Sequence, residues 1–217
     1  MKYYKAYDKR YRAVHGMGLR WTSDIKTPIV LDTLDKYCEK NGKVLEIGCG
    51  EGRDAKAVFD EGYNLCATDI SDEAVEFCKS QMPKRAERFF VLDCINGKLD
   101  IKFDFIYSVA VLHMLTEDND RAAFYKFIKE HLKDGGKALV LSMGDGEREF
   151  CTDPDKAYEL KERECAGKTV KVASTTCRIV NFDTFEHEIR TAGFDIAEKG
   201  LTSCPPEFDS LLYAVIK

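Results

Sequence analysis

The chain has 217 residues, of which 44% are hydrophobic and 33% charged, and its net charge at pH 7 is −5. This composition suits a single globular domain, and the negative balance argues against a broad surface for binding nucleic acid. No run of about 18 apolar residues occurs, so we expect no membrane-spanning helix. The N-terminus does not resemble a secretory signal and the nine cysteines are scattered singly, which favours a cytoplasmic protein with reduced thiols.

The first forty residues are predicted to be helical. Aromatic and apolar residues recur there at the spacing of one helical face: Tyr3, Tyr7, Tyr11 and Val14. We expect this face to dock onto the core, and the alternative is that it also covers the active site. A second helix is predicted from Pro28 to about Cys38, because Thr27 can cap it and proline suits the first helical position.

The most informative segment is a glycine-rich turn between a strand and a helix. A short apolar strand contains Glu46, and a helix-like segment opens at Arg53. Between them three glycines alternate with other residues: Gly48, Gly50 and Gly52. Such a turn lets a ligand approach bare backbone and free N–H groups. A dinucleotide-binding turn would need its third glycine at position 53, and a P-loop would need Gly-Lys-Ser/Thr, so neither pattern fits.

Alternating strands and helices follow this turn. Strand-like runs at 63–68, 88–92 and 103–108 are separated by a helix at 72–81 and followed by a helix at 117–132 and a strand to position 141. Asp69 ends the first run, about 20 residues after the turn, where a carboxylate can accept both ribose hydroxyls of a nucleoside. Asp93 and Cys94 end the second run, and Val109 ends the third.

These motifs, in this order, resemble those of the class I S-adenosylmethionine-dependent methyltransferases, whose first motif has the form E-x-G-x-G-x-G. The resemblance implies an α/β, Rossmann-like, doubly wound sheet of seven strands, mostly parallel with an antiparallel last strand and with helices on both faces. It also implies S-adenosyl-L-methionine as the cofactor. The implied cofactor-binding residues lie in the turn and at the strand ends: Glu46, Gly48, Cys49, Gly50, Gly52, Arg53, Asp69, Ile70, Asp93, Cys94 and Val109.

The resemblance suggests a role for several of these side chains. Asp93 matches the acidic residue that receives the adenine amino group, and Glu46 is expected to accept hydrogen bonds from the donor's ammonium or from the loop. Arg53 is expected to pair with the donor's carboxylate, with a solvated helix arginine as the alternative. His113 is a candidate general base, with a buried structural histidine as the alternative.

The implied reaction is in-line methyl transfer to an oxygen, nitrogen or sulfur atom of a small molecule. We expect no metal, because the run from Ser108 to Ala110 lacks the carboxylate that metal-dependent members carry there. The alternatives are a protein or RNA methyltransferase, and a non-catalytic protein that binds S-adenosylmethionine. An NAD-dependent reductase is disfavoured by Arg53 in place of a third glycine and by Asp93.

Candidate acceptor-binding residues lie outside the family's motifs: Tyr11, His15, Arg20, Trp21 and Arg178. Trp21 beside Arg20 would supply a wall and an anion clamp for a carboxylate substrate. The alternative is that Trp21 seals the edge of the core while Arg20 is solvated.

We predict one domain over 1–217, with a helical cap or lid at 1–39, a core at 40–141 and 181–217, and an insertion at 142–180. Within the insertion, a charged helix is expected at 155–164, and 169–173 is expected to pair with 177–180. A helix at 183–192 and two terminal strands, near 194–198 and 211–216, complete the core. The sequence does not indicate the oligomeric state.

Overall fold

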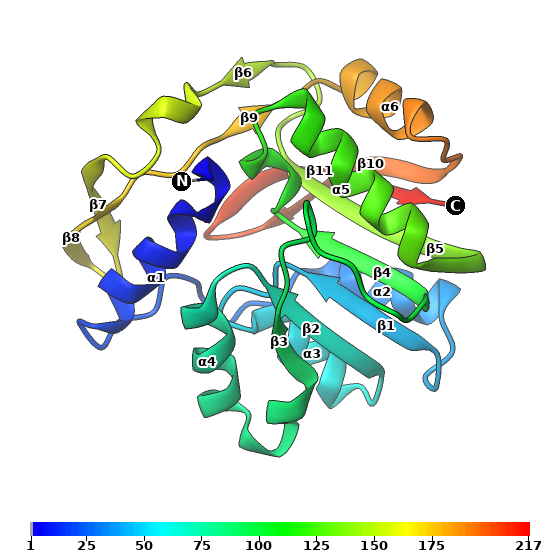
Figure 1. Cartoon of the computed structure of the whole chain (residues 1–217), viewed down its shortest axis with the longest axis horizontal. Coiled ribbons are helices and arrows are strands. Elements are labelled where there is room, and N and C mark those ends of the chain that lie inside the picture. Colours follow the sequence, from blue (N-terminus) through cyan, green and yellow to red (C-terminus); the bar gives the residue numbers. More distant parts are fainter. Residues whose placement is uncertain (1) are drawn as a thin grey trace.

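A seven-stranded sheet forms the centre of the computed structural model, which describes residues 2–217 (Figure 1). The strand order is β10-β11-β5-β4-β1-β2-β3. The strands are β1 Lys43–Ile47, β2 Asn64–Asp69, β3 Phe89–Val91, β4 Phe103–Val109, β5 Leu132–Met143, β10 Ile196–Cys204 and β11 Phe208–Ile216. The first five strands pair in parallel, and β11 is antiparallel to both β5 and β10. The predicted fold class is confirmed.

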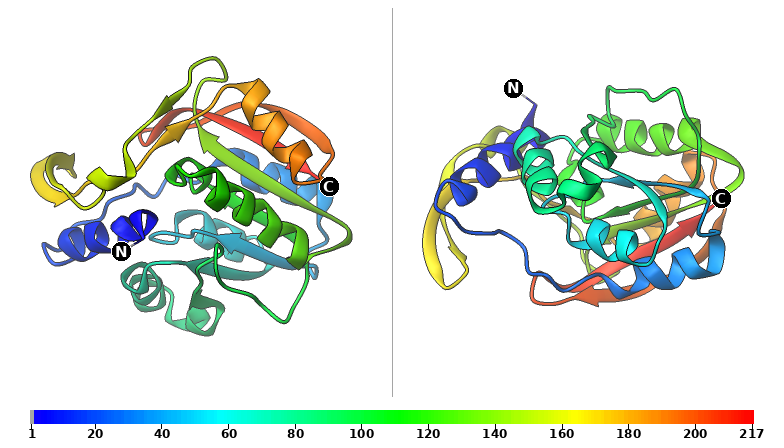
Figure 2. Two further views of the ribbon diagram at one scale, coloured as in Figure 1. Left: turned by 45° about the horizontal axis from the view of Figure 1, so that its top comes forward. Right: turned by 90° about the horizontal axis from the view of Figure 1, so that it is seen from below.

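Helices cover both faces of this sheet (Figures 1 and 2). One apolar cluster joins one face to three of them: α2 Pro28–Tyr37, α3 Arg53–Asp60 and α4 Asp72–Gln81. A second cluster joins the opposite face to two others: α5 Asp118–His131 and α6 Phe182–Thr191. Short 3-10 turns lie at η1 Tyr3–Lys5, η2 Pro83–Arg88, η3 Leu112–Met114 and η4 Pro154–Lys156.

Local signals set most of the helix ends. The Ser71 hydroxyl accepts a hydrogen bond from the Ala74 N–H at 3.1 Å, and the Asn181 side chain accepts one from the Thr184 N–H at 2.8 Å. Thr27 precedes α2 as predicted, but its side chain makes no cap within that helix. It binds a carboxylate of α3 instead, so this boundary residue links two helices.

The N-terminal helix α1, Ala6–His15, packs against a hairpin of β7 Leu160–Cys165 and β8 Lys168–Ala173 (Figure 2). The two elements share a small apolar cluster of their own, with Val14 against Val170 and Val172. The buried Arg10 guanidinium donates to the Ala173 carbonyl at 2.9 and 3.1 Å. We call residues 2–22 together with this hairpin the cap.

The predicted helix at 155–164 is wrong, because β7 occupies the second half of that range. Charged residues favour a helix there, but the left-handed backbone at Ala166 and Gly167 turns the chain into a hairpin, and burial of β8 on α1 holds it. The predicted pairing of 169–173 with 177–180 is also wrong, since β9 Arg178–Ile179 pairs with β6 Phe150–Cys151. Over residues 2–217, none of the helices combines the length and apolarity needed to cross a bilayer.

Candidate functional site

A cavity of about 370 Å³ lies at the carboxyl ends of the central strands, beneath the cap. This is where ligands bind in open α/β sheets, because the loops that leave parallel strands meet at that edge. Most of the residues predicted to bind the cofactor line it: Glu46, Gly48, Cys49, Gly50, Arg53, Asp69, Ile70, Asp93, Cys94 and Val109. Gly52 is not among the lining residues.

The three glycines of the turn all have positive φ angles, of 78°, 52° and 80°. A Cβ atom on Gly48 would stand 2.1 Å from Cγ2 of Val111, and one on Gly50 would stand 2.8 Å from the Tyr11 hydroxyl. Gly52 meets side chains of α4 instead. The first two glycines therefore let Val111 and Tyr11 pack closely against the loop at the cavity wall, whereas the third allows the loop to pack on Cys78 and Met82 at the end of α4.

Two aspartates line the cavity at the carboxyl ends of β2 and β3. The Asp69 carboxylate accepts hydrogen bonds from the Gly50 N–H at 2.8 Å and the Ser71 N–H at 2.9 Å, and burial raises its pKa. The Asp93 carboxylate accepts from the Ile95 N–H at 3.1 Å. Each carboxylate thus holds the loop that follows its strand while it still faces the cavity.

Glu46 is buried at the cavity wall with 2% of its surface exposed. Its Oε2 atom has no hydrogen-bond partner among residues 2–217. Burial, with a smaller contribution from Asp54, raises the pKa of Glu46 well above its usual range. An unpartnered carboxyl oxygen at this position can accept a hydrogen bond from a cation or an N–H group of a ligand.

Arg53 lines the cavity, but its guanidinium already has protein partners. It donates to Asp54 and to the Thr27 hydroxyl, each at 2.9 Å, and it lies 3.5 Å from Glu207. Burial lowers the pKa of Arg53, but the charge and hydrogen bond of Asp54 together with the charges of Cys204 and Glu207 outweigh that effect, and the net pKa is raised. Arg53 therefore joins the start of α3 to α2 and to the turn between β10 and β11.

His113 does not line the cavity. It is 5% exposed, its Nδ1 atom has no partner among residues 2–217, and its ring lies 6.0 Å from the Phe208 ring. Burial, assisted by the charge of Arg121, lowers its pKa to about 4. A general base must reach the proton that it abstracts, and the structure gives His113 no such access.

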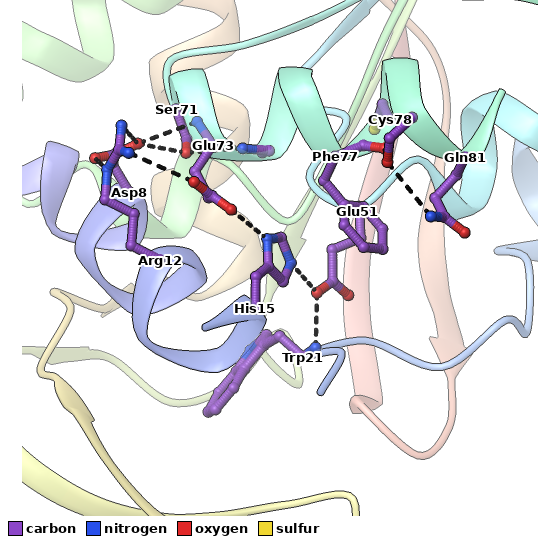
Figure 3. Close-up of polar contacts among 12 residues, drawn as sticks. Asp8, Arg12, His15, Trp21, Glu51, Ser71, Glu73, Phe77, Cys78 and Gln81 are labelled. Atoms are coloured by element: carbon purple, nitrogen blue, oxygen red, sulfur yellow. Dashed lines mark hydrogen bonds and ion pairs between the residues drawn. The ribbon is translucent and has the colours of Figure 1, made fainter. Parts of the chain in front are cut away.

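The candidate acceptor residues divide into two groups. Tyr11 and Trp21 line the cavity, whereas His15, Arg20 and Arg178 do not. Arg20 pairs with Asp24, and Arg178 donates to the Thr116 carbonyl and pairs with Asp118. His15 lies between two carboxylates, with both ring nitrogens occupied (Figure 3). The predicted anion clamp of Arg20 and Trp21 is not formed, because the Arg20 guanidinium pairs with the carboxylate of Asp24.

The cavity also contains residues that sequence analysis did not assign to the site: Tyr4, Tyr7, Thr22, Glu51, Asp54, Ile95, Met114, Leu115, Glu207 and Phe208. The spacing of the N-terminal tyrosines was the only signal for any of them. The wall is acidic, with six carboxyl groups and one guanidinium. Nevertheless, no three His, Cys, Asp or Glu side chains within residues 2–217 are grouped so as to hold a metal ion.

Comparisons with known proteins agree with this geometry. Residues 45–138 match a family described as a methyltransferase domain. Cypemycin N-terminal methyltransferase of a Streptomyces species is 28% identical over 117 residues, which cover 51% of this chain and 42% of that protein. Ribosomal RNA small subunit methyltransferase C of Serratia proteamaculans is 25% identical over 144 residues, covering 64% and 41%. The chain spans about half the length, or less, of such curated relatives.

Among solved structures, the glycopeptide N-methyltransferase MtfA superposes with a TM-score of 0.66 and 18% identity, covering 88% of this chain and 89% of that one. At this identity the likeness establishes the fold. The family match covers the glycine loop, Asp69, Asp93 and the strand that ends at Val109. The resemblance predicted from these motifs is confirmed.

Proposed function

We propose that this chain, a methyltransferase-domain protein of the class I fold, transfers a methyl group from S-adenosyl-L-methionine to an oxygen, nitrogen or sulfur atom of a small molecule. The observation that carries the proposal is the cavity wall at the carboxyl ends of β1, β2 and β3. There the glycine loop, Asp69 and Asp93 face one space within the part of the chain that matches the family. MtfA, which shares the fold, has been solved with S-adenosylhomocysteine and with S-adenosylmethionine.

The residues present fit this donor. Gly48 and Gly50 line the cavity without side chains of their own, and Val111 and Tyr11 pack where their Cβ atoms would stand, so a ligand can approach the remaining backbone of the loop closely. The unpartnered Oε2 atom of Glu46 would accept a hydrogen bond from the donor's ammonium group. Asp69 would accept from the ribose hydroxyls, since each of its oxygens now receives one hydrogen bond and has a further lone pair. Asp93 would receive the adenine amino group.

The rest of the wall supports a small acceptor with an apolar body. Tyrosine, tryptophan, methionine, leucine and phenylalanine side chains line it: Tyr4, Tyr7, Trp21, Met114, Leu115 and Phe208. Among residues 2–217, Arg53 is the one cationic side chain of the lining, and it is paired with Asp54. An anionic acceptor would meet carboxylates without a free cation, so we propose a neutral or cationic acceptor.

The chain's contribution to the reaction is positioning. When bound, the donor supplies an electrophilic methyl group on a sulfonium, and the acceptor atom must be held in line with it. The cap covers the cavity and excludes water from it. His113 is neutral at physiological pH and does not line the cavity, so we assign it no proton transfer.

Titration calorimetry tests the donor site. We expect S-adenosylhomocysteine to bind and NAD not to bind. Asp69→Asn should weaken that binding more than tenfold, because hydrogen bonds to a charged group contribute about 1.5–3 kcal/mol each. Asp72→Asn, at the exposed start of α4, is the matched control and should leave the affinity unchanged. The proposal would be contradicted if NAD bound more tightly than S-adenosylhomocysteine. It would also be contradicted if Asp69→Asn and the wild type bound S-adenosylhomocysteine with equal affinity.

A second assay tests the acceptor class. Formation of S-adenosylhomocysteine is measured with matched pairs of aromatic amines and aromatic carboxylates, and with an unstructured RNA and a denatured protein. We expect turnover among the neutral or cationic small molecules. Turnover confined to the macromolecules would favour the protein or RNA alternative, and donor binding without any turnover would favour the non-catalytic one.

A further inference from the structure

We propose that His15 is a positioning residue which bridges Glu51 and Glu73 and thereby keeps the cap closed over the cavity. The inference rests on the proposed function, because the molecule whose exchange the cap would limit is the methyl donor. His15 ends α1, Glu51 belongs to the glycine loop and Glu73 begins α4, so one side chain connects three parts of the site (Figure 3).

The contacts of His15 are short and largely buried. Its Nε2 atom lies 2.9 Å from Oε1 of Glu51, and its Nδ1 atom lies 2.9 Å from Oε1 of Glu73. Only 8% of the His15 side chain is exposed, and none of the Glu51 side chain. The imidazole ring also stacks on the Phe77 ring, with centroids 4.3 Å apart. The ring is therefore fixed in one orientation.

The shape of the imidazole allows this bridge. Its two ring nitrogens point in different directions from one planar side chain, so each can contact a different carboxylate group. A glutamine side chain ends in a single amide group, so at position 15 we expect it to keep at most one of the two contacts.

We call His15 and its two partners, Glu51 and Glu73, the clamp. Other charged and titratable groups surround it. Arg12 and Asp8 lie on α1, and Arg12 reaches Oε2 of Glu73 at 3.4 Å. Arg20, from the loop after α1, lies over the Phe77 ring, and the Cys165 thiol of β7 lies near Glu51. Arg12 contacts Oε2 of Glu73, whereas His15 contacts Oε1 of Glu73 and Oε1 of Glu51. Among the side chains named here, His15 is therefore the one that bridges both carboxylates.

Glu51 carries the effect of the clamp to the cavity. Its carboxylate also accepts hydrogen bonds from the Trp21 N–H, the Thr22 N–H and the Thr22 hydroxyl, each at 2.7 Å. Trp21, Thr22 and Tyr11 of the cap all line the cavity. One buried carboxylate next to Gly50 therefore attaches both ends of this cap segment to the glycine loop, and His15 links that carboxylate to α4.

The consequence is a cap whose closure depends on the two contacts of His15. While both contacts are made, α1, the glycine loop and α4 are held together and the cap stays closed. When the contacts are lost, the cap opens more often and a bound donor escapes faster.

Trp21 provides a built-in probe for the test. It is the only tryptophan of the chain, it lines the cavity, and its ring lies 4.6 Å from the Arg10 guanidinium. Stopped-flow fluorescence would give the dissociation rate of S-adenosylhomocysteine. His15→Gln should dissociate about tenfold faster than the wild type.

Two further variants separate the clamp from a general loss of structure. Glu73→Gln leaves Glu51 and its bonds to the cap in place, and should accelerate dissociation by a smaller factor than His15→Gln. Glu76→Gln, on the exposed face of α4, is the matched control and should behave as the wild type does. Identical dissociation rates for the wild type, His15→Gln and Glu73→Gln would overturn the proposal.

Hydrogen exchange in the ligand-free protein distinguishes this inference from the proposed function. The amides of α1, Trp21 and Thr22 should exchange faster in His15→Gln than in the wild type, while those of β1 and β4 should not change. If S-adenosylhomocysteine fails to bind the wild type but this acceleration occurs, the proposed function is wrong and the clamp stands. If binding is normal and cap exchange is unchanged, the clamp is wrong.

Discussion

The hydroxyl oxygen of Tyr11 lies 2.8 Å from the point at which a Cβ atom on Gly50 would stand. Tyr11 belongs to the cap and is buried, and Gly50 is the middle glycine of the loop, with a φ angle of 52°. The cap therefore closes to within contact distance of bare backbone. A glycine at position 50 allows both the left-handed backbone and this close approach.

Gly50→Ala should weaken binding of S-adenosylhomocysteine about tenfold, because the new methyl group displaces Tyr11 and the left-handed backbone costs about 1–2 kcal/mol. Removal of the hydroxyl leaves Cζ of Tyr11, at 3.8 Å, as the nearest atom. In the double variant with Tyr11→Phe the affinity should therefore recover toward that of Tyr11→Phe alone. Calorimetry on all four proteins checks this. If the second change restores nothing, the Tyr11 contact is not the cause.

Arg121 holds the segment that follows β4 and is only 1% exposed. It makes a two-pronged ion pair with Glu188, at 2.7 Å for each bond, and donates to the carbonyls of Leu112 and Leu115. Arg121→Ala should destabilise the protein by about 3–5 kcal/mol, because it leaves a largely buried carboxylate without its main partner. Urea unfolding measures this.

Lys126→Ala is the matched control for Arg121→Ala. Lys126 lies on the exposed side of the same helix, 3.8 Å from Glu130, and its loss should change the stability by no more than about 0.5 kcal/mol. Similar losses in the two variants would mean that helix propensity, and not the buried ion pair, determines the effect.

Removal of residues 1–20 should leave the sheet folded but abolish methyl transfer. The two large apolar clusters draw only on Tyr3 and Tyr4 from this segment, whereas the small cluster of the hairpin needs Val14. Hydrogen exchange should therefore show protected β1, β4 and β5 strands and an unprotected β7–β8 hairpin. Loss of cooperative unfolding would show that the segment belongs to the core, and full activity would show that it does not form the site.

Local signals in the sequence accounted for much of the fold and for one wall of the cavity. Ser71, Pro83 and the alternating apolar runs act within a few residues of the ends that they determine. Glu46, Gly48 and Gly50 lie within five positions of one another, so a strand followed by a turn necessarily brings them together. Short-range patterns predicted the helix at 72–81 and the strands of the core correctly, whereas the helix predicted at 155–164 was wrong.

Long-range packing determined the rest. Glu207 and Phe208 reach the cavity from a hairpin far along the chain, and no local pattern marks them. The strand at Leu160–Cys165 has one buried residue out of six, so it shows no alternation of buried and exposed residues, and its pairing with β8, which packs on α1, holds it extended. His15 was expected to bind substrate because it precedes Trp21, whereas its partners lie on two other elements.

His113 gives a prediction about stability in acid. Burial, assisted by Arg121, lowers its pKa from 6.5 to about 4 in the folded protein, while the unfolded chain keeps the ordinary value. Between these two values the unfolded chain binds more protons, so the contribution of His113 is fully present above pH 6.5 and is lost as the pH falls toward 4. The loss should reach about 2 kcal/mol at about pH 5.

His113→Gln removes this titration, because glutamine is neutral at every pH. The wild type should therefore lose about 2 kcal/mol more stability than the variant between about pH 7 and pH 5, as measured by urea unfolding at each pH. His187→Gln, on the exposed face of α6, should follow the wild-type curve. If the curves of the wild type and His113→Gln stay parallel, His113 accepts a proton in the folded state as easily as in the unfolded one. It would then reach solvent or a proton-accepting partner, and its exclusion from the chemistry of the cavity would no longer hold.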